Sequence, residues 1–137
     1  MMQDTKLNLT IGVSIIVGIA LVAVLSKYDT SREIRKIAKA KNEIQALSKK
    51  IQEHYYTFGS FPRALTDSNL QKLIAELPTT DPFSSEKEPY RYVTEDSNFK
   101  IYSVGPNGVD DGGRASQGDR LLDIVVEFRK PPAKGKP

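Results

Sequence analysis

The feature that most constrains this chain is a run of twenty residues without a charged side chain, residues 7–26. Lys6 and Lys27 bracket the run, and a helix of that length, at about 1.5 Å per residue, spans about 30 Å, the hydrocarbon thickness of a bilayer. A cleaved secretory signal is the alternative, but the run exceeds a usual signal core and no clear small-x-small cleavage site follows it. We therefore expect an uncleaved transmembrane helix over residues 7–26, preceded by an N-terminal segment, residues 1–6.

Composition limits what the rest of the chain can be. The 137 residues leave room for one small domain beyond the membrane anchor, and there is no Cys and a single His. Structural zinc, thiol catalysis and disulfide bonds are thereby excluded. The net charge is only +3, with basic residues gathered in RKPPAKGKP at residues 129–137, a composition typical of a disordered tail. The aromatic residues lie at core-like positions without an interleaved basic stripe, so nucleic-acid binding is not expected.

Residues 27–58 are expected to form an amphipathic helix. Thr30 with Glu33 fits a capping box, so the helix either starts there or continues from the span through a kink near Tyr28. A coiled-coil seam is the alternative to packing on the chain's own sheet, but the apolar stripe lasts only about three heptads. His54 lies off the centre of this stripe and is expected on a solvated face. The stripe has the three-and-four spacing of one helical face and consists of Ile34, Ile37, Ala40, Ile44, Leu47, Ile51, Tyr55 and Phe58.

Residues 59–128 are expected to form a small α+β domain. Gly59 ends the long helix, and Ser68 with Gln71 forms a capping box for a short helix that Pro78 ends. Three β-rich segments follow, the first two joined as an antiparallel hairpin. They are residues 90–94, 99–104 and 122–128. The expected fold class is therefore α+β, with the long helix packed on a three-stranded antiparallel sheet.

A Gly/Asp-rich loop, residues 103–123, connects the second and third expected strands. Its glycines permit positive φ angles and its polar side chains offer hard oxygen ligands, a combination that suits a structural Ca²⁺ ion. An EF-hand is excluded, because starting at Asn107 places Val109 at the third position and Gly118 at the twelfth, where a Glu is required. A solvated cluster of turns is the alternative. The candidate metal ligands are Asn107, Asp110, Asp111, Asp119 and Asp123.

Several segments in fixed order resemble the major pseudopilin, or G subunit, of type II secretion systems. The similarity covers roughly ninety residues. Residues 77–83, LPTTDPF, match a Leu-Pro followed by Asp-Pro-Trp, and residues 102–108, YSVGPNG, match Ser-x-Gly-Pro-Asp-Gly. Asp123 with Ile124 matches the end of Asp-Asp-Ile. The other matching residues are Ile44, Leu47, Tyr55, Gly59, Phe61, Pro62, Tyr90 and Tyr92.

The resemblance implies a pilin-like fold, anchored in the bacterial inner membrane by one span, with the C-terminal domain in the periplasm. The basic residues just after the span favour the cytoplasm by the positive-inside rule, and the resemblance favours the opposite orientation. In that family the loop binds calcium. Two ligand positions carry over, to Asn107 and Asp123, whereas Leu122 stands where the family has an Asp.

The resemblance also sets the expected function. The first residues, MMQDTKLNLTIG, differ from the family's leader and its Phe-Thr-Leu-Ile-Glu motif. We therefore expect a non-enzymatic structural subunit that docks to other membrane or envelope proteins in a secretion system or pilus-related machine. A pseudopilin that polymerises with copies of itself is the first alternative. A membrane-anchored binding module or hydrolase that uses the Asp cluster is the second.

Overall fold

The computed structural model describes the backbone of residues 2–115 and 122–131, and the side chains of residues 29–115 and 122–131. The chain divides into two compact units, residues 1–35 and 36–137. The first unit is helical wherever it is described. The second contains the end of the long helix, a short helix and a three-stranded antiparallel sheet, which confirms the α+β class.

One long helix, α1 (Met2–Phe58), includes both the expected membrane span and the expected amphipathic helix. The side chains of the span, residues 7–26, lie outside those that are described. Over the residues with described side chains, no helix combines the length and the apolar character needed to cross a bilayer.

The middle of the predicted apolar stripe of α1 forms the centre of the core. Ala40, Ile44, Leu47 and Ile51 have no exposed surface, whereas Phe58 at the end of the stripe is 51% exposed and the earlier Ile34 is 59% exposed. The length of the strands explains why only the middle of this apolar stripe is buried. A six-residue strand such as β2 is about 20 Å long, and about thirteen helical residues cover that distance. The stripe is thus longer than the sheet that can cover it.

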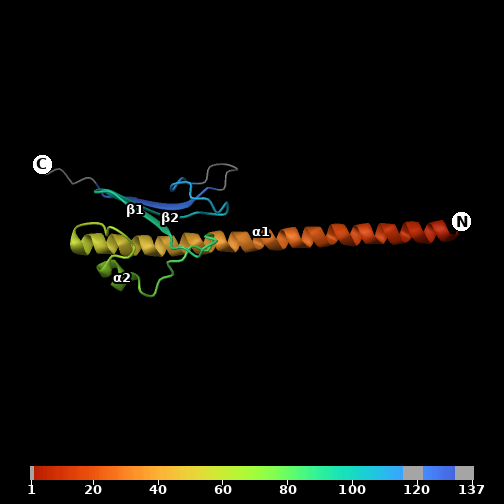
Figure 1. Ribbon diagram of the computed structural model, residues 1–137, viewed down its shortest axis with the longest axis horizontal. Helices are drawn as coiled ribbons and strands as arrows, with labels where there is room; N and C mark the ends of the chain where they lie inside the picture. The colour runs from red at the N-terminus through yellow and green to blue at the C-terminus, as the bar shows by residue number, and fades with distance from the viewer. Residues whose placement is uncertain (1, 116–121, 132–137) are drawn as a thin grey trace. The chain divides into compact units, whose positions relative to one another are not determined.

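The sheet consists of β1 (Arg91–Thr94), β2 (Asn98–Ser103) and β3 (Ile124–Arg129), in the order β1-β2-β3. Each strand lies within two residues of its predicted bounds. In Figure 1 the strands lie on one side of the end of α1, and α2 lies on the other. One face of β3 is partly buried against the core and consists of alternate residues of the strand, Ile124, Val126 and Phe128.

The turn after α1 begins at Gly59, as predicted, with φ +78° and its N–H donated to the Tyr55 carbonyl at 2.8 Å. The chain then folds back over the end of the helix, where the Phe61 ring stacks on Tyr55 at 4.6 Å. The same turn covers His54, which is only 4% exposed. The prediction that His54 is solvated is therefore wrong. Its spacing from Ile51 and Phe58 continues the helical stripe, and the Ser60 carbonyl supplies a polar partner for Nδ1 at 3.1 Å.

The short helix α2 (Ser68–Ile74) begins as predicted but with a different cap. Asp67, rather than Ser68, is the N-cap, since its carboxylate accepts the backbone N–H groups of Asn69 and Leu70. The helix ends at Ile74, well before Pro78, and buries Leu70 and Ile74 in the core. A chain of seven helical residues is enough to place these two side chains.

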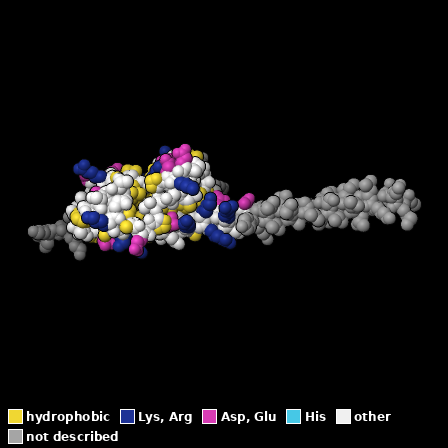
Figure 2. All heavy atoms as spheres, turned by 60° about the horizontal axis from the view of Figure 1, so that its bottom comes forward, with side chains coloured by type: hydrophobic (Ala, Val, Ile, Leu, Met, Phe, Trp, Pro, Cys, Tyr) yellow, Lys and Arg dark blue, Asp and Glu magenta, His cyan; other side chains and the backbone are white. Residues whose placement is uncertain are grey.

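The surface in Figure 2 shows basic and acidic side chains interspersed with small apolar groups on the face that it presents. At the C-terminal end, Arg129 still belongs to β3, and the Lys130 N–H is donated to the Ser97 carbonyl at 2.7 Å. The expected tail, residues 129–137, therefore starts later than the composition indicates, and residues 132–137 lie outside the described residues.

Replacement of Ile44 by Ala tests the burial of α1 against the sheet. Ile44→Ala should lower the free energy of unfolding by about 2–5 kcal/mol, because a fully buried isoleucine leaves a cavity. The matched control on the same helix, Ile34→Ala, should change it by no more than about 0.5 kcal/mol, because that side chain is mostly exposed. Urea unfolding of the full-length chain in mild detergent, followed by tyrosine near-ultraviolet circular dichroism, measures both. Equal losses would contradict the packing described.

Candidate functional site

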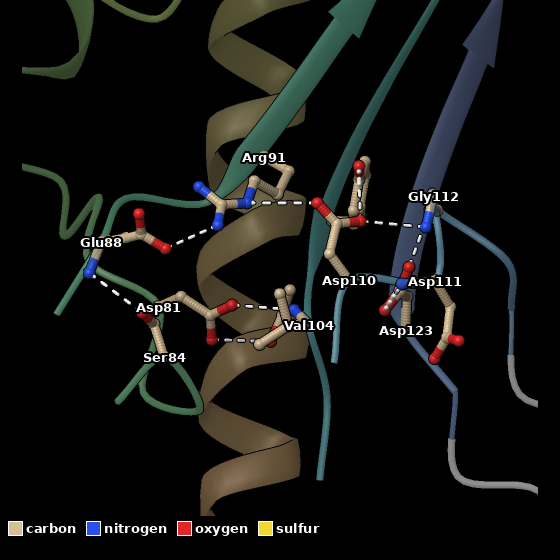
Figure 3. Close-up of polar contacts among 12 residues, drawn as sticks. Asp81, Ser84, Glu88, Arg91, Val104, Asp110, Asp111, Gly112 and Asp123 are labelled. Atoms are coloured by element: carbon tan, nitrogen blue, oxygen red, sulfur yellow. Dashed lines mark hydrogen bonds and ion pairs between the residues drawn. The ribbon is translucent and has the colours of Figure 1, made fainter. Parts of the chain in front are cut away.

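Asp81 fixes the start of the Gly/Asp loop at the end of β2. Its carboxylate is 2% exposed and accepts the Ser103 hydroxyl at 2.7 Å and the Val104 N–H at 2.8 Å. It also accepts the N–H of Phe83 at 2.9 Å, which holds its own turn. Figure 3 shows Asp81 beside Val104, on the opposite side of this region from Asp110 and Asp123. Because the Ser103 hydroxyl and the Val104 N–H are buried with it, the carboxylate continues the hydrogen bonding of β2 after the strand ends.

Sequence reasoning did not identify Asp81 as part of the site. The residue belongs to the LPTTDPF segment, more than twenty positions from the loop, and its neighbours indicate only a turn. A signal was nevertheless present. An Asp before Pro in a turn commonly accepts a backbone N–H two residues on, as Asp81 does from Phe83.

A tight turn opens the loop. The Gly108 N–H is donated to the Gly105 carbonyl at 3.0 Å, and the Asn107 Oδ1 accepts the Val109 N–H at 3.0 Å. The amide Nδ2 of Asn107 is donated to the Asp111 carboxylate at 2.8 Å. Asn107 is exposed, and both polar ends of its side chain form hydrogen bonds within the loop, one with the backbone of Val109 and one with Asp111.

Asp110 ties the loop to β1 and β2. Its Oδ1 accepts the Tyr102 hydroxyl at 3.1 Å and the Gly112 N–H at 2.9 Å, while Oδ2 lies 3.4 Å from the Arg91 Nε. Burial and the hydrogen bond to Asp110 raise the pKa of Tyr102 to about 12, so it stays a donor at neutral pH. Arg91 also pairs with Glu88 at 2.5 Å, and Figure 3 shows the guanidinium between the two carboxylates.

Asp123 anchors the far end of the loop. It is 1% exposed, and its two oxygens accept the Asp111 N–H at 3.3 Å and the Gly113 N–H at 2.7 Å. Burial raises the pKa of Asp123, those two N–H groups lower it, and the carboxylates of Asp111 and Asp110 raise it again. Ionised Asp123 is therefore held in a field that disfavours its charge, which is the condition that a nearby cation relieves.

Two glycines let these segments approach each other. A Cβ at Gly105 would lie 2.3 Å from the Leu122 carbonyl oxygen, and one at Gly113 would lie 2.5 Å from the Lys100 side chain. Both also have positive φ, +67° and +69°, where a side chain adds strain. Gly105 is the tighter site, because the atom it meets belongs to the backbone.

The five predicted metal ligands are brought together in part. Asp110, Asp111 and Asp123 gather at the base of the loop, Asn107 lies on its exposed turn, and Asp119 lies outside the described residues. Within the described residues, no three His, Asp or Glu side chains are grouped closely enough to hold a metal ion. Asp110 is paired with Arg91, which leaves Asp111 and Asp123 as the two carboxylates that fit a hard cation best.

Comparison with known protein families, with curated proteins and with solved structures finds no match to this chain.

A pair of glycine substitutions tests how closely the two ends of the loop approach. Gly105→Ala should destabilise the domain by more than about 2 kcal/mol, since the positive φ and the contact with the Leu122 carbonyl act together. The control is Gly112→Ala, where φ is +72° but nothing lies within 4 Å of an added Cβ. It should cost only the strain of the left-handed backbone, about 1–2 kcal/mol. Urea unfolding measures the difference, and a smaller loss for Gly105→Ala would contradict the close approach.

Proposed function

We propose that this protein is a non-enzymatic structural subunit of a bacterial envelope machine, anchored in the inner membrane by one helix. In this proposal the second unit is a pilin-like domain in the periplasm that docks to other membrane or envelope proteins. The machine is a secretion system or a pilus-related assembly.

The observation that carries this proposal is the combination found within α1. The helix contains an uncharged run of membrane-spanning length, and its C-terminal part buries a row of side chains fully against a small antiparallel sheet. One helix that both anchors the chain and forms part of the domain core suits a structural subunit, whose role is to hold a fixed place in an assembly. The segments that resemble the type II major pseudopilin lie in this same helix, in the Asp81 turn and around Asp123.

We further propose that the Gly/Asp loop binds one Ca²⁺ ion, with Asp123 and Asp111 as principal ligands. Support comes from the raised pKa of Asp123 and from the neighbouring carboxylates of Asp111 and Asp110, which contribute to that rise. A bound Ca²⁺ would relieve the repulsion among these carboxylates and hold the crossing between β2 and β3. The ion would stabilise the fold and take no part in chemistry.

The assembly state of the protein tests the structural role. The full-length chain, extracted from its native membrane in mild detergent, should migrate in a defined complex with other envelope proteins. Lys36→Glu is a control for non-specific charge contacts, because this side chain lies at the domain's surface, 5.8 Å from the Phe83 ring. Filaments or ladders of identical subunits would instead support the polymerising pseudopilin. A free monomer with hydrolytic activity would overturn both.

Chelation tests the calcium proposal separately. Removing Ca²⁺ from the full-length chain with EGTA should lower Tm by about 5 °C, as expected for the loss of about 1–2 kcal/mol of ligand binding. Asp123→Asn should abolish this response, while Asp96→Asn, which alters an exposed turn between β1 and β2, should retain it. An unchanged melting curve of the unmodified chain would exclude the calcium site and leave the structural role standing.

A further inference from the structure

A second polar site lies at the other end of the domain, away from the Gly/Asp loop. It is a pocket of about 490 Å³ between the end of α1, the turn after it, the start of α2 and the turn between β1 and β2. This volume lies in the range of pockets that hold ligands. Arg63, Glu95 and Asp96 are exposed at its rim, and His54 lines it from α1.

The buried wall of the pocket holds a nitrogen that lacks a hydrogen-bond partner. His54 is 4% exposed, and among the described residues its Nε2 has no such partner. Its Nδ1 lies 3.1 Å from the Ser60 carbonyl oxygen. A carbonyl oxygen can only accept, so Nδ1 carries the hydrogen, and in the neutral ring Nε2 is a bare acceptor.

Nε2 faces a second acceptor. The Asp67 Oδ1 lies 3.5 Å away, and the same oxygen already accepts the N–H groups of Asn69 and Leu70 as the cap of α2. These N–H groups, that of Leu70 foremost, lower the pKa of Asp67, and the interaction with His54 lowers it further. A lone pair and a carboxylate in this arrangement repel each other unless a donor lies between them. With the ring neutral, the pocket thus lacks one hydrogen-bond donor.

The charge around the pocket indicates what the donor is. Three carboxylates line it, those of Asp67, Glu95 and Asp96, against the single guanidinium of Arg63. The Phe58 ring lines it too, with its centroid 4.6 Å from that of His54. Carboxylates and an aromatic face together favour a cation that carries N–H groups.

We propose that this pocket binds a basic side chain, a lysine ammonium or an arginine guanidinium, of a partner protein. The cation's N–H groups are donated to His54 Nε2 and the Asp67 carboxylate, and Glu95 and Asp96 at the rim attract it. The site does not depend on the calcium ion or on the membrane assembly proposed above, so either proposal can fail without the other.

The single histidine of the chain makes a direct test possible, because its imidazole resonances belong to His54 alone. The full-length protein, labelled with ¹⁵N-histidine in mild detergent at about pH 8, above the usual titration range of imidazole, is titrated with three probes. They are the N-acetyl methylamides of lysine, arginine and norleucine, the last being a neutral chain of similar length. One or both basic probes should shift the Nε2 resonance saturably, and norleucine should not. The responding probe distinguishes an ammonium site from a guanidinium site.

Variants separate the charge from the fold. Asp67→Asn should weaken binding of the basic probe about tenfold, while Asn preserves the cap of α2. If that variant fails to fold, the rim double variant Glu95→Gln with Asp96→Asn should weaken it several-fold, since both residues are exposed. Glu127→Gln, on β3 outside the pocket, should bind as the unmodified protein does.

Two results overturn the proposal. The first is a shift with norleucine as large as with the basic probes, or no shift with any of them. The second is a free protein in which both imidazole nitrogens carry hydrogens at about pH 8. His54 and Asp67 would then form an internal ion pair that needs no ligand.

Discussion

Burial of one short face of α1 against the sheet is the interaction on which the domain depends. A three-stranded sheet has too little apolar area to be stable alone, and here Ile44, Leu47 and Ile51 supply fully buried side chains along its inner face. The aromatic rings of Phe61, Phe99 and Phe128 extend that core toward the end of the helix. The turn at Gly59 contributes to the same packing, because it returns the chain over the helix at the point where the sheet ends.

At the edge of this core, two buried aspartates accept hydrogen bonds from backbone N–H groups, as paired strands do within the sheet. Asp81 receives donors just past the end of β2, and Asp123 receives them from the loop just before β3. Their surroundings differ in charge. Asp81 is held by a hydroxyl and backbone N–H groups, while Asp123 also lies in the field of Asp110 and Asp111. The two anchors are therefore alike in geometry, but only the second gains from a nearby cation.

The elements of this fold follow from local patterns, whereas the polar site depends on contacts between distant segments. The alternation in β3 and the spacing of Ile44, Leu47 and Ile51 predict their burial because periodicity alone determines which side a residue faces. The burial of His54 depends on the turn beyond Gly59, and the role of Asp81 on a contact with Ser103 across 22 positions. The N-cap of α2 is Asp67 and not the predicted Ser68. Both residue types are good N-caps, so the sequence alone does not distinguish them. Composition alone predicts which acidic residues the loop contains. The pairing of Asp110 with Arg91 depends on a contact with β1 and could not be predicted in this way.

The close approach of Gly105 to the Leu122 carbonyl also joins the two ends of the loop to each other. This contact and the bridge between Ala115 and Asp123 close the base of the loop into a ring. Neither contact depends on the number of residues in the rest of the loop. Closing a longer ring costs little, about 0.6 kcal/mol for each doubling of its length. The helix and the sheet should consequently keep their packing when this crossing is lengthened, because the contacts that close the ring are made by Gly105, Ala115 and Asp123 at its base.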